Sequence, residues 1–221
     1  MAAHATPAFP LNSPLLPGMA LPLRLFEPRY LTMVADLLAG TDPSFVVSLI
    51  TRGHEVGGGA GSGEERSPVG CTATIVDAAE HPDRTWSVLA AGTERVRIDR
   101  WLDDAPYPRA LVEAWPDPPV DDDTDVVDRI DLLELEVLEL VALATELGLP
   151  RPDLDHDFSG DPTVRVYQFA TVCPLGAHDR HRLLCAPDLP GRVELLADLV
   201  GEQQLLLGAR RDFGRGDGPD G

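Results

Sequence analysis

Residues 16–30 read LPGMALPLRLFEPRY, and within this stretch a strand pattern changes into a helix pattern. The Pro17-Gly18 pair is typical of a tight turn, and Leu21-Pro22-Leu23 is typical of a strand that such a turn feeds. Phe26 and Tyr30 stand four residues apart around the helix start, where they would pack the helix against a barrel. The stretch therefore predicts a short strand followed by a helix that covers β-structure.

The rest of residues 1–116 has a β pattern. Six short segments rich in Val, Ile, Leu, Thr or aromatic residues are bounded by Gly, Pro or Asp, and a hairpin turn is expected at Ala91-Gly92-Thr93. This many short strands favours a small barrel or a sandwich. We expect the strands at Met19–Leu25, Ser44–Ile50, Val69–Asp77, Thr85–Ala91, Glu94–Arg100 and Tyr107–Trp115.

An acidic, proline-containing stretch, Asp117-Pro118-Pro119-Val120-Asp121-Asp122-Asp123, separates this region from an α-helical one. After it, apolar residues recur at alternating intervals of four and three, which predicts a long helix to about Leu147. Further helices are expected at 162–173, 177–185 and 189–207. We thus expect a β-barrel over 1–116, an acidic linker with a helical bundle over 117–208, and a disordered tail over 209–221. The apolar stripe is Val126, Ile130, Leu133, Val137, Leu140, Ala144 and Leu147.

Composition excludes several functions. The 221-residue chain carries a formal charge of −19, and all 18 of its basic residues are arginine. The absence of lysine excludes a Ser–Lys dyad and a phosphate-loop lysine. The acidic balance makes nucleic acid and anionic membranes unfavourable partners. Three widely spaced cysteines and an N-terminus without a signal-peptide pattern predict a reduced, cytoplasmic protein.

Catalytic and metal-binding motifs are not met. The glycine run over 57–63 does not fit GxGxxG spacing, and GxSxG and HExxH do not occur. His178 and His181 lie three residues apart without a third ligand nearby in the sequence. Cys71 lies in a predicted strand, and the sequence leaves open whether its thiol is reactive. We expect no catalytic residue, no metal and no cofactor.

The N-terminal half resembles the N-terminal domain of ATP-dependent Lon proteases, the Lon substrate-binding domain. The likeness is strongest over residues 9–116 and extends more weakly to about residue 207, through Leu183–Arg192. The segments that carry it are Phe9-Pro10-Leu11, Leu16–Leu23, Leu25–Tyr30, Phe45–Ile50, Val69–Ala73, Gly92–Ile98 and Pro106-Tyr107.

This resemblance implies an α+β fold: a PUA-like β-barrel followed by a helical bundle. In Lon, this region recognises substrate, while an AAA+ module and a Ser–Lys protease domain perform the reaction. The sequence contains neither a Walker A motif nor any lysine, so we expect a free-standing Lon-N-like protein without enzyme activity.

The expected function is to bind exposed apolar polypeptide segments of a client protein, as an adaptor or chaperone-like factor that works with a protease or a chaperone. Such binding requires an exposed apolar surface on the protein. Two alternatives stay open, an RNA-binding PUA-like module and a scaffold that forms homo-oligomers through the long helical stripe. The candidate polypeptide-binding residues are Phe26, Arg29, Tyr30, Trp101 and Tyr107.

Overall fold

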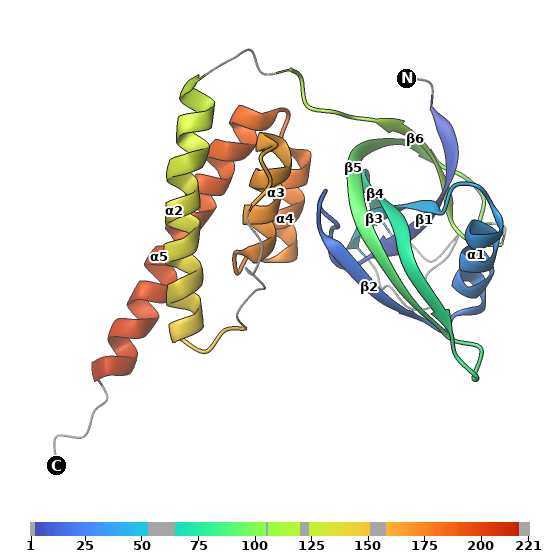
Figure 1. The fold of residues 1–221 in the computed structure, drawn as a ribbon, viewed down its shortest axis with the longest axis horizontal. Helices are drawn as coiled ribbons and strands as arrows, with labels where there is room; N and C mark the ends of the chain where they lie inside the picture. Colours follow the sequence, from blue (N-terminus) through green and yellow to red (C-terminus); the bar gives the residue numbers. More distant parts are fainter. Residues whose placement is uncertain (1–2, 53–64, 105, 120–123, 151–157, 217–221) are drawn as a thin grey trace. The chain divides into compact units, whose positions relative to one another are not determined.

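The chain folds into two compact units, Met1–Pro116 and Asp117–Gly221, which we call the barrel unit and the helical unit. The computed structural model describes residues 3–52, 65–104, 106–119, 124–150 and 158–216. The described strands all lie in the barrel unit together with one helix, and the helical unit contains the remaining helices (Figure 1). The predicted α+β fold is confirmed. The glycine run over 57–63 and the aspartates at 121–123 lie outside the described residues.

The six strands of the barrel unit form one sheet with the order β2-β5-β4-β3-β1-β6. β5 also pairs with β6, so five strands close into a barrel, and β2 extends the sheet beside the first half of β5. Proline is tolerated on β2 because an edge strand has one side without ladder hydrogen bonds. The strands are β1 (His4–Leu11), β2 (Ala20–Leu25), β3 (Ser44–Arg52), β4 (Glu65–Glu80), β5 (Trp86–Trp101) and β6 (Arg109–Ala114).

The hairpin turn expected at Ala91-Gly92-Thr93 is wrong, because β5 runs without a break through these residues. Gly92 marks a close approach of two backbones instead. Its carbonyl accepts from the N–H of Gly18 at 2.8 Å, and its own N–H donates to Met19 at 2.9 Å. A Cβ on Gly92 would lie 2.2 Å from the carbonyl oxygen of Leu16, so only glycine fits.

β1 is a strand that the sequence pattern did not predict. Pro7 and Pro10 interrupt its pattern, yet Ala8–Leu11 pair in parallel with β3 and His4–Pro7 pair antiparallel with β6. The strand therefore changes partners midway, and each half forms ladder hydrogen bonds on one side only. That arrangement accommodates both prolines.

The core of the barrel unit has two clusters on opposite faces of the sheet. In the larger one, helix α1 (Pro28–Ala39) packs Tyr30 and Met33 onto the sheet, and the Tyr30 ring centroid lies 4.1 Å from that of Phe9. The smaller cluster is Ala8, Val46, Val96, Ile98, Ala110 and Val112. β1 and β3 contribute to both clusters, which explains why alternation along them is weak.

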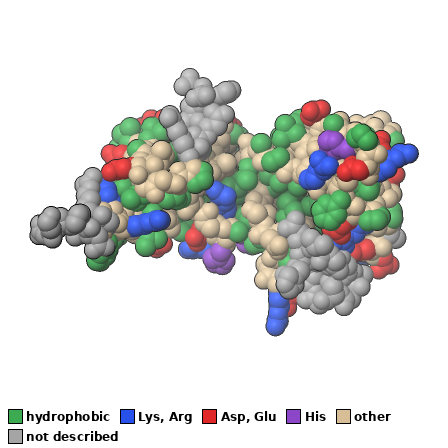
Figure 2. Space-filling model, turned by 90° about the horizontal axis from the view of Figure 1, so that it is seen from below, with side chains coloured by type: hydrophobic (Ala, Val, Ile, Leu, Met, Phe, Trp, Pro, Cys, Tyr) green, Lys and Arg blue, Asp and Glu red, His purple; other side chains and the backbone are tan. Residues whose placement is uncertain are grey.

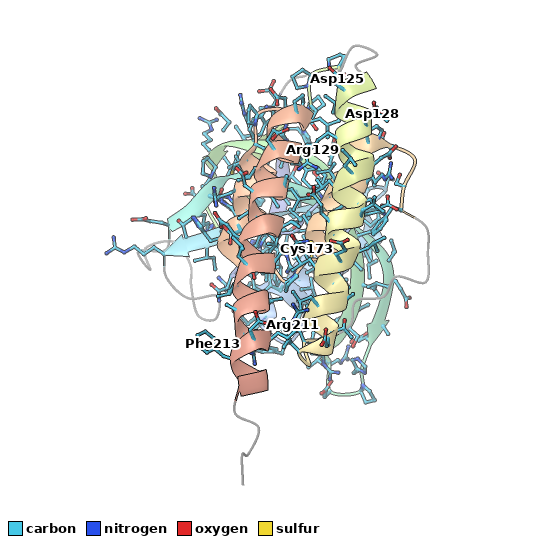
Figure 3. The ribbon with its side chains drawn as sticks, turned by 90° about the vertical axis from the view of Figure 1, so that its left-hand side faces the viewer. Asp125, Asp128, Arg129, Cys173, Arg211 and Phe213 are labelled. Atoms are coloured by element: carbon cyan, nitrogen blue, oxygen red, sulfur yellow. The ribbon has the colours of Figure 1, made fainter. Side chains whose placement is uncertain are left out.

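The helical unit contains α2 (Thr124–Glu146), α3 (Pro162–Val172), α4 (Ala177–Cys185) and α5 (Leu189–Gly216). α2 and α5 lie side by side (Figures 1 and 3). The centre of the predicted stripe, from Ile130 to Ala144, is buried within this unit, so the stripe forms the unit's own core. No helix in the described ranges is both long and apolar enough to span a bilayer.

Helix α5 extends past the end that the sequence predicts. It continues to Gly216, so the disordered tail expected over 209–221 is wrong for residues 209–216, and 217–221 lie outside the described part. The physical reason lies in the residues themselves. Ala209, Arg210 and Arg211 are good helix formers, and the next proline comes only at residue 219.

Candidate functional site

Two of the five residues predicted to bind polypeptide belong to the core. Tyr30 is 4% exposed and packs on Phe9. Tyr107 is buried in the same cluster, and its hydroxyl donates to Asp36 Oδ2 at 3.1 Å. Burial, and then the hydrogen bond with Asp36, raise the pKa of Tyr107. Both tyrosines hold α1 and the 106–109 segment in place.

Arg29 and Trp101 are partly buried and already have partners. The Arg29 guanidinium pairs with Glu27, at 3.0 Å between Nη2 and Oε2, and lies 4.6 Å from the centroid of the Tyr30 ring. Trp101 packs against the smaller cluster, with the Arg66 guanidinium 4.4 Å from its ring centroid. These contacts fix local structure, so a role of either residue in polypeptide binding stays a prediction.

Phe26 is the one member of the five that is exposed, at 58%. It does not pack α1 on the barrel as the four-residue spacing predicts; Tyr30 alone does so. On β2, the residues Ala20, Pro22 and Arg24 are exposed and alternate with Leu21, Leu23 and Leu25, which face the larger cluster. Phe26 thus continues an exposed row that begins on the edge strand.

This row is part of an exposed apolar surface. Leu89 on β5 lies directly opposite Pro22, and it also pairs with Asp77 on β4. A register shift between Ile75 and Asp77 leaves Val76 60% exposed beside this pair. We call Pro22, Phe26, Val76 and Leu89 the outer apolar surface. Figure 2 shows hydrophobic side chains at the surface of the barrel unit, between charged ones.

The sequence analysis missed Val76 and Leu89. Both lie in segments with a strand pattern, and hydrophobicity alone does not show which face of a strand is covered. Their exposure depends on the bulge at Val76 and on the position of β2 at the sheet edge. Neither feature is visible before the strands are paired.

A cavity of about 600 Å³ opens beside the first half of β1. Its walls come from β1, the end of α1 and the starts or middles of β3, β4 and β5. Polar side chains dominate, since hydroxyl groups occur on four of these elements. The lining residues are His4, Ala5, Thr6, Pro7, Leu37, Asp42, Ser44, Thr72, Thr74, Thr93 and Glu94. Because the sequence did not predict β1, it gave no signal for this cavity.

The cysteines are free, and two of them are buried. Burial raises the pKa of the Cys71 thiol far above its usual value, so Cys71 is a structural residue of β4. Burial raises the pKa of Cys173 to about 12. Cys185 is partly exposed, with its Sγ 3.6 Å from His181 Nε2. Nowhere in the described ranges do three His, Cys, Asp or Glu side chains come together in a way that could hold a metal ion.

The arginines of the barrel unit mostly contact other side chains of that unit. Arg24 lies 3.6 Å from Asp83, and the guanidinium groups of Arg95 and Arg97 lie 3.8 and 4.0 Å from the ring centroid of Trp115. Arg95 is 4% exposed and donates from Nε to the Trp115 carbonyl at 3.0 Å. Arginines held in this way offer little free charge to a phosphate backbone.

Comparison with known proteins now places this barrel and bundle in a family. The family model described as the ATP-dependent protease La (LON) substrate-binding domain matches residues 5–202. The chain belongs to this family. The region matched is the substrate-binding domain, and neither the ATPase nor the protease domain of Lon is matched.

Two curated relatives are similar along most of the chain. A protein named Lon protease 2, from Sorangium cellulosum, is 28% identical over 224 residues, which cover 96% of this chain and 26% of the relative. A Lon protease from Anaeromyxobacter dehalogenans is 24% identical, over 91% of this chain and 23% of the relative. The chain thus spans about a quarter of the length of these relatives.

Two solved structures are similar to this chain over most of its length. The crystal structure of a Lon N-terminal domain protein from Xanthomonas campestris has a TM-score of 0.59 and 25% identity, and the match covers 87% of this chain and 96% of that one. The N-terminal domain of a Mycobacterium avium complex Lon protease has a TM-score of 0.60 and 15% identity, covering 90% and 98%. The second of these shows the fold alone.

Proposed function

We propose that this protein binds exposed apolar segments of polypeptide at the outer apolar surface. One observation carries the proposal: Phe26, Val76 and Leu89 are 58, 60 and 40% exposed, and among the large apolar residues described in the barrel unit only Leu38 of α1, at 43%, is also exposed. Each such side chain gains roughly 1.5–3 kcal/mol when a partner covers it fully. Membership of a substrate-binding family supports a polypeptide as that partner.

The edge strand gives a way to hold an extended polypeptide. β2 is at the end of the strand order, and in the part of the chain that the structure describes it pairs with β5 alone. An extended segment can add to such an edge through main-chain hydrogen bonds, which do not depend on the client's sequence. The neighbouring apolar side chains then select clients that have lost their fold.

The binding itself needs no catalytic step. We propose that the protein acts as a non-enzymatic adaptor or chaperone-like factor, which passes bound polypeptide to a protease or a chaperone. A reduced cytoplasmic setting is part of this proposal, and the three free thiols are compatible with it.

The test is a binding measurement with a labelled protein that is kept unfolded by reduction and carboxymethylation. The double variant Phe26→Ser/Val76→Ser removes two exposed apolar side chains and is expected to weaken binding about tenfold, since half-covered side chains contribute about 1.4 kcal/mol together. Leu206→Ser is the matched control, because Leu206 is 61% exposed in the helical unit. Equal loss in both variants, or no binding by the wild type, contradicts the proposal.

A second candidate function, self-association, is favoured by a separate observation. Leu132 and Leu135 on α2 and Leu205 and Phe213 on α5 are between 57 and 82% exposed. Figure 3 shows acidic Asp125 and Asp128 on α2, and Arg211 with Phe213 near the far end of α5. The α2 surface combines carboxylates with exposed leucines, and the end of α5 combines an arginine with an exposed phenylalanine. These two surfaces, one from each of two copies, are complementary in charge and can cover each other's apolar side chains.

Sedimentation velocity over a range of concentrations tests this second candidate. We expect a monomer–dimer equilibrium that Phe213→Ser shifts to monomer and that high salt weakens. A wild-type protein that stays monomeric at all concentrations excludes it.

A further inference from the structure

We propose that the cavity beside β1 binds a cationic side chain, the ammonium of lysine or the guanidinium of arginine, of a bound polypeptide. The inference rests on the proposed function and names the class of polypeptide that the barrel unit prefers. Three features of the cavity support it: how the strands form the cavity, which polar groups line it, and where it lies on the sheet relative to the outer apolar surface.

The cavity exists because two neighbouring strands separate. β1 pairs with β3 only from Ala8 onward, whereas His4–Pro7 pair with β6. β3 pairs with β4 from its start, where Ser44 lies opposite Thr74, but its pairing with β1 begins only at Val46. A space of about 600 Å³ is left between the separated strands, within the size range of ligand sites in proteins.

A largely buried threonine lines this space. Thr6 is only 8% exposed, and it is one of the lining residues from β1. Three other lining hydroxyls have hydrogen bonds: Ser44 and Thr74 share one of 3.0 Å, and Thr93 donates to the Thr72 carbonyl at 3.2 Å. A hydroxyl both donates and accepts hydrogen bonds, so Thr6 offers one such group to a ligand in this space.

The charge of the lining selects a cation. Asp42 and Glu94 are its acidic members, and no arginine lines the space. Neither carboxylate forms an ion pair within the described ranges. Ionised carboxylates only accept hydrogen bonds, and ammonium and guanidinium groups only donate them. The net charge of −19 adds a favourable far field for a cation.

The cavity and the outer apolar surface are on one face of the sheet. Thr74, in the cavity wall, lies opposite Ala91 on β5, and Ala91 lies opposite Ala20 on β2. Two strand spacings separate Thr74 from Ala20, roughly 10 Å. An extended segment held at β2 can therefore place apolar residues near Pro22 and direct a long cationic side chain toward Thr74 and the cavity.

The experiment compares four labelled, unstructured peptides that share apolar residues and differ at one central position: lysine, arginine, glutamine or glutamate. We expect the lysine and arginine peptides to bind wild-type protein about tenfold more tightly than the glutamine peptide, because two exposed carboxylates contribute up to about 1 kcal/mol each. Asp42→Asn/Glu94→Gln should remove this preference and leave binding of the glutamine peptide unchanged.

Matched variants distinguish binding at the cavity from attraction by the protein's overall negative charge. Asp99→Asn/Asp103→Asn removes the same charge from exposed positions of the barrel unit outside the cavity lining, and it should keep most of the preference. Thr6→Val should weaken the lysine peptide severalfold while its thermal unfolding stays close to that of the wild type. If all four peptides bind equally well, the cavity proposal is wrong and polypeptide binding stands. If none binds, the proposed function itself fails.

Discussion

Arg192 of α5 and Asp117, 75 residues earlier, form a bidentate ion pair inside the helical unit. Nη1 lies 2.5 Å from Oδ2 and Nη2 lies 2.9 Å from Oδ1. The Arg192 side chain is fully buried, donates from Nε to the Leu183 carbonyl at 3.1 Å, and lies 4.3 Å from the centroid of the Tyr167 ring. One arginine thus fixes the first residue of the unit to α3, α4 and α5.

Replacing this arginine should destabilise the helical unit strongly. Arg192→Leu leaves the Asp117 carboxylate buried without its partner, which costs about 3 to 5 kcal/mol. Ellipticity at the helix wavelength in urea measures this effect. The three tryptophans, Trp86, Trp101 and Trp115, all lie in the barrel unit, so their fluorescence is the internal control and should change little. Arg192→Leu/Asp117→Leu should recover part of the loss; no recovery contradicts the charge explanation.

A matched pair of aromatic substitutions tests the division between core and surface in the predicted site. Tyr30→Ala removes a buried ring that packs on Phe9 and should lower the free energy of unfolding by about 3 to 5 kcal/mol. Phe26→Ala removes a ring that is 58% exposed and should change it by less than about 0.5 kcal/mol. Tryptophan fluorescence in urea reports both. A large loss for Phe26→Ala would place that ring in the core.

Most helices and strands could be predicted from the sequence, because the spacing of apolar residues shows which face of an element is buried. The stripe from Ile130 to Ala144 and the start of α3, where Asp161 caps the N–H of Val164 at 3.0 Å, follow from spacing and capping rules. Strand β1 and the unbroken length of β5 could not be predicted from these rules. Proline and glycine usually mark turns, and here Pro7, Pro10 and Gly92 serve tertiary contacts instead.

The candidate site was predicted only in part. Aromatic residues in a familiar motif include both core and surface positions, and spacing cannot separate Tyr30 from Phe26. The cavity depends on where β1 leaves β3, which is a property of strand pairing. The Asp42 and Glu94 side chains come from positions 52 residues apart and show no pattern in the sequence.

Gly92→Ala tests whether a close approach explains this glycine. The added Cβ would lie 2.2 Å from the Leu16 carbonyl oxygen, and backbone atoms cannot move aside as a flexible side chain can. We expect a loss of about 1 to 3 kcal/mol in the barrel unit, or more if the 16–19 segment is displaced. Gly176→Ala is the control, because a Cβ there meets nothing within 4 Å. If the unfolding midpoint of Gly92→Ala, followed by tryptophan fluorescence, equals that of the wild type, the close-approach explanation is wrong.

The buried thiol of Cys173 should make the helical unit less stable at high pH. An unfolded thiol ionises near pH 8.5, whereas burial raises the pKa of Cys173 to about 12. Above about pH 9 the unfolded state releases a proton that the folded state keeps, so the free energy of unfolding falls by up to about 1.4 kcal/mol per pH unit until the folded thiol also ionises. Cys173→Ala should remove this slope, measured by helix ellipticity in urea between about pH 8 and pH 10.5. Cys185→Ala, at a partly exposed position, should retain it. If the two variants show equal slopes, another group causes the loss, since only Cys173 combines full burial with a thiol in this unit.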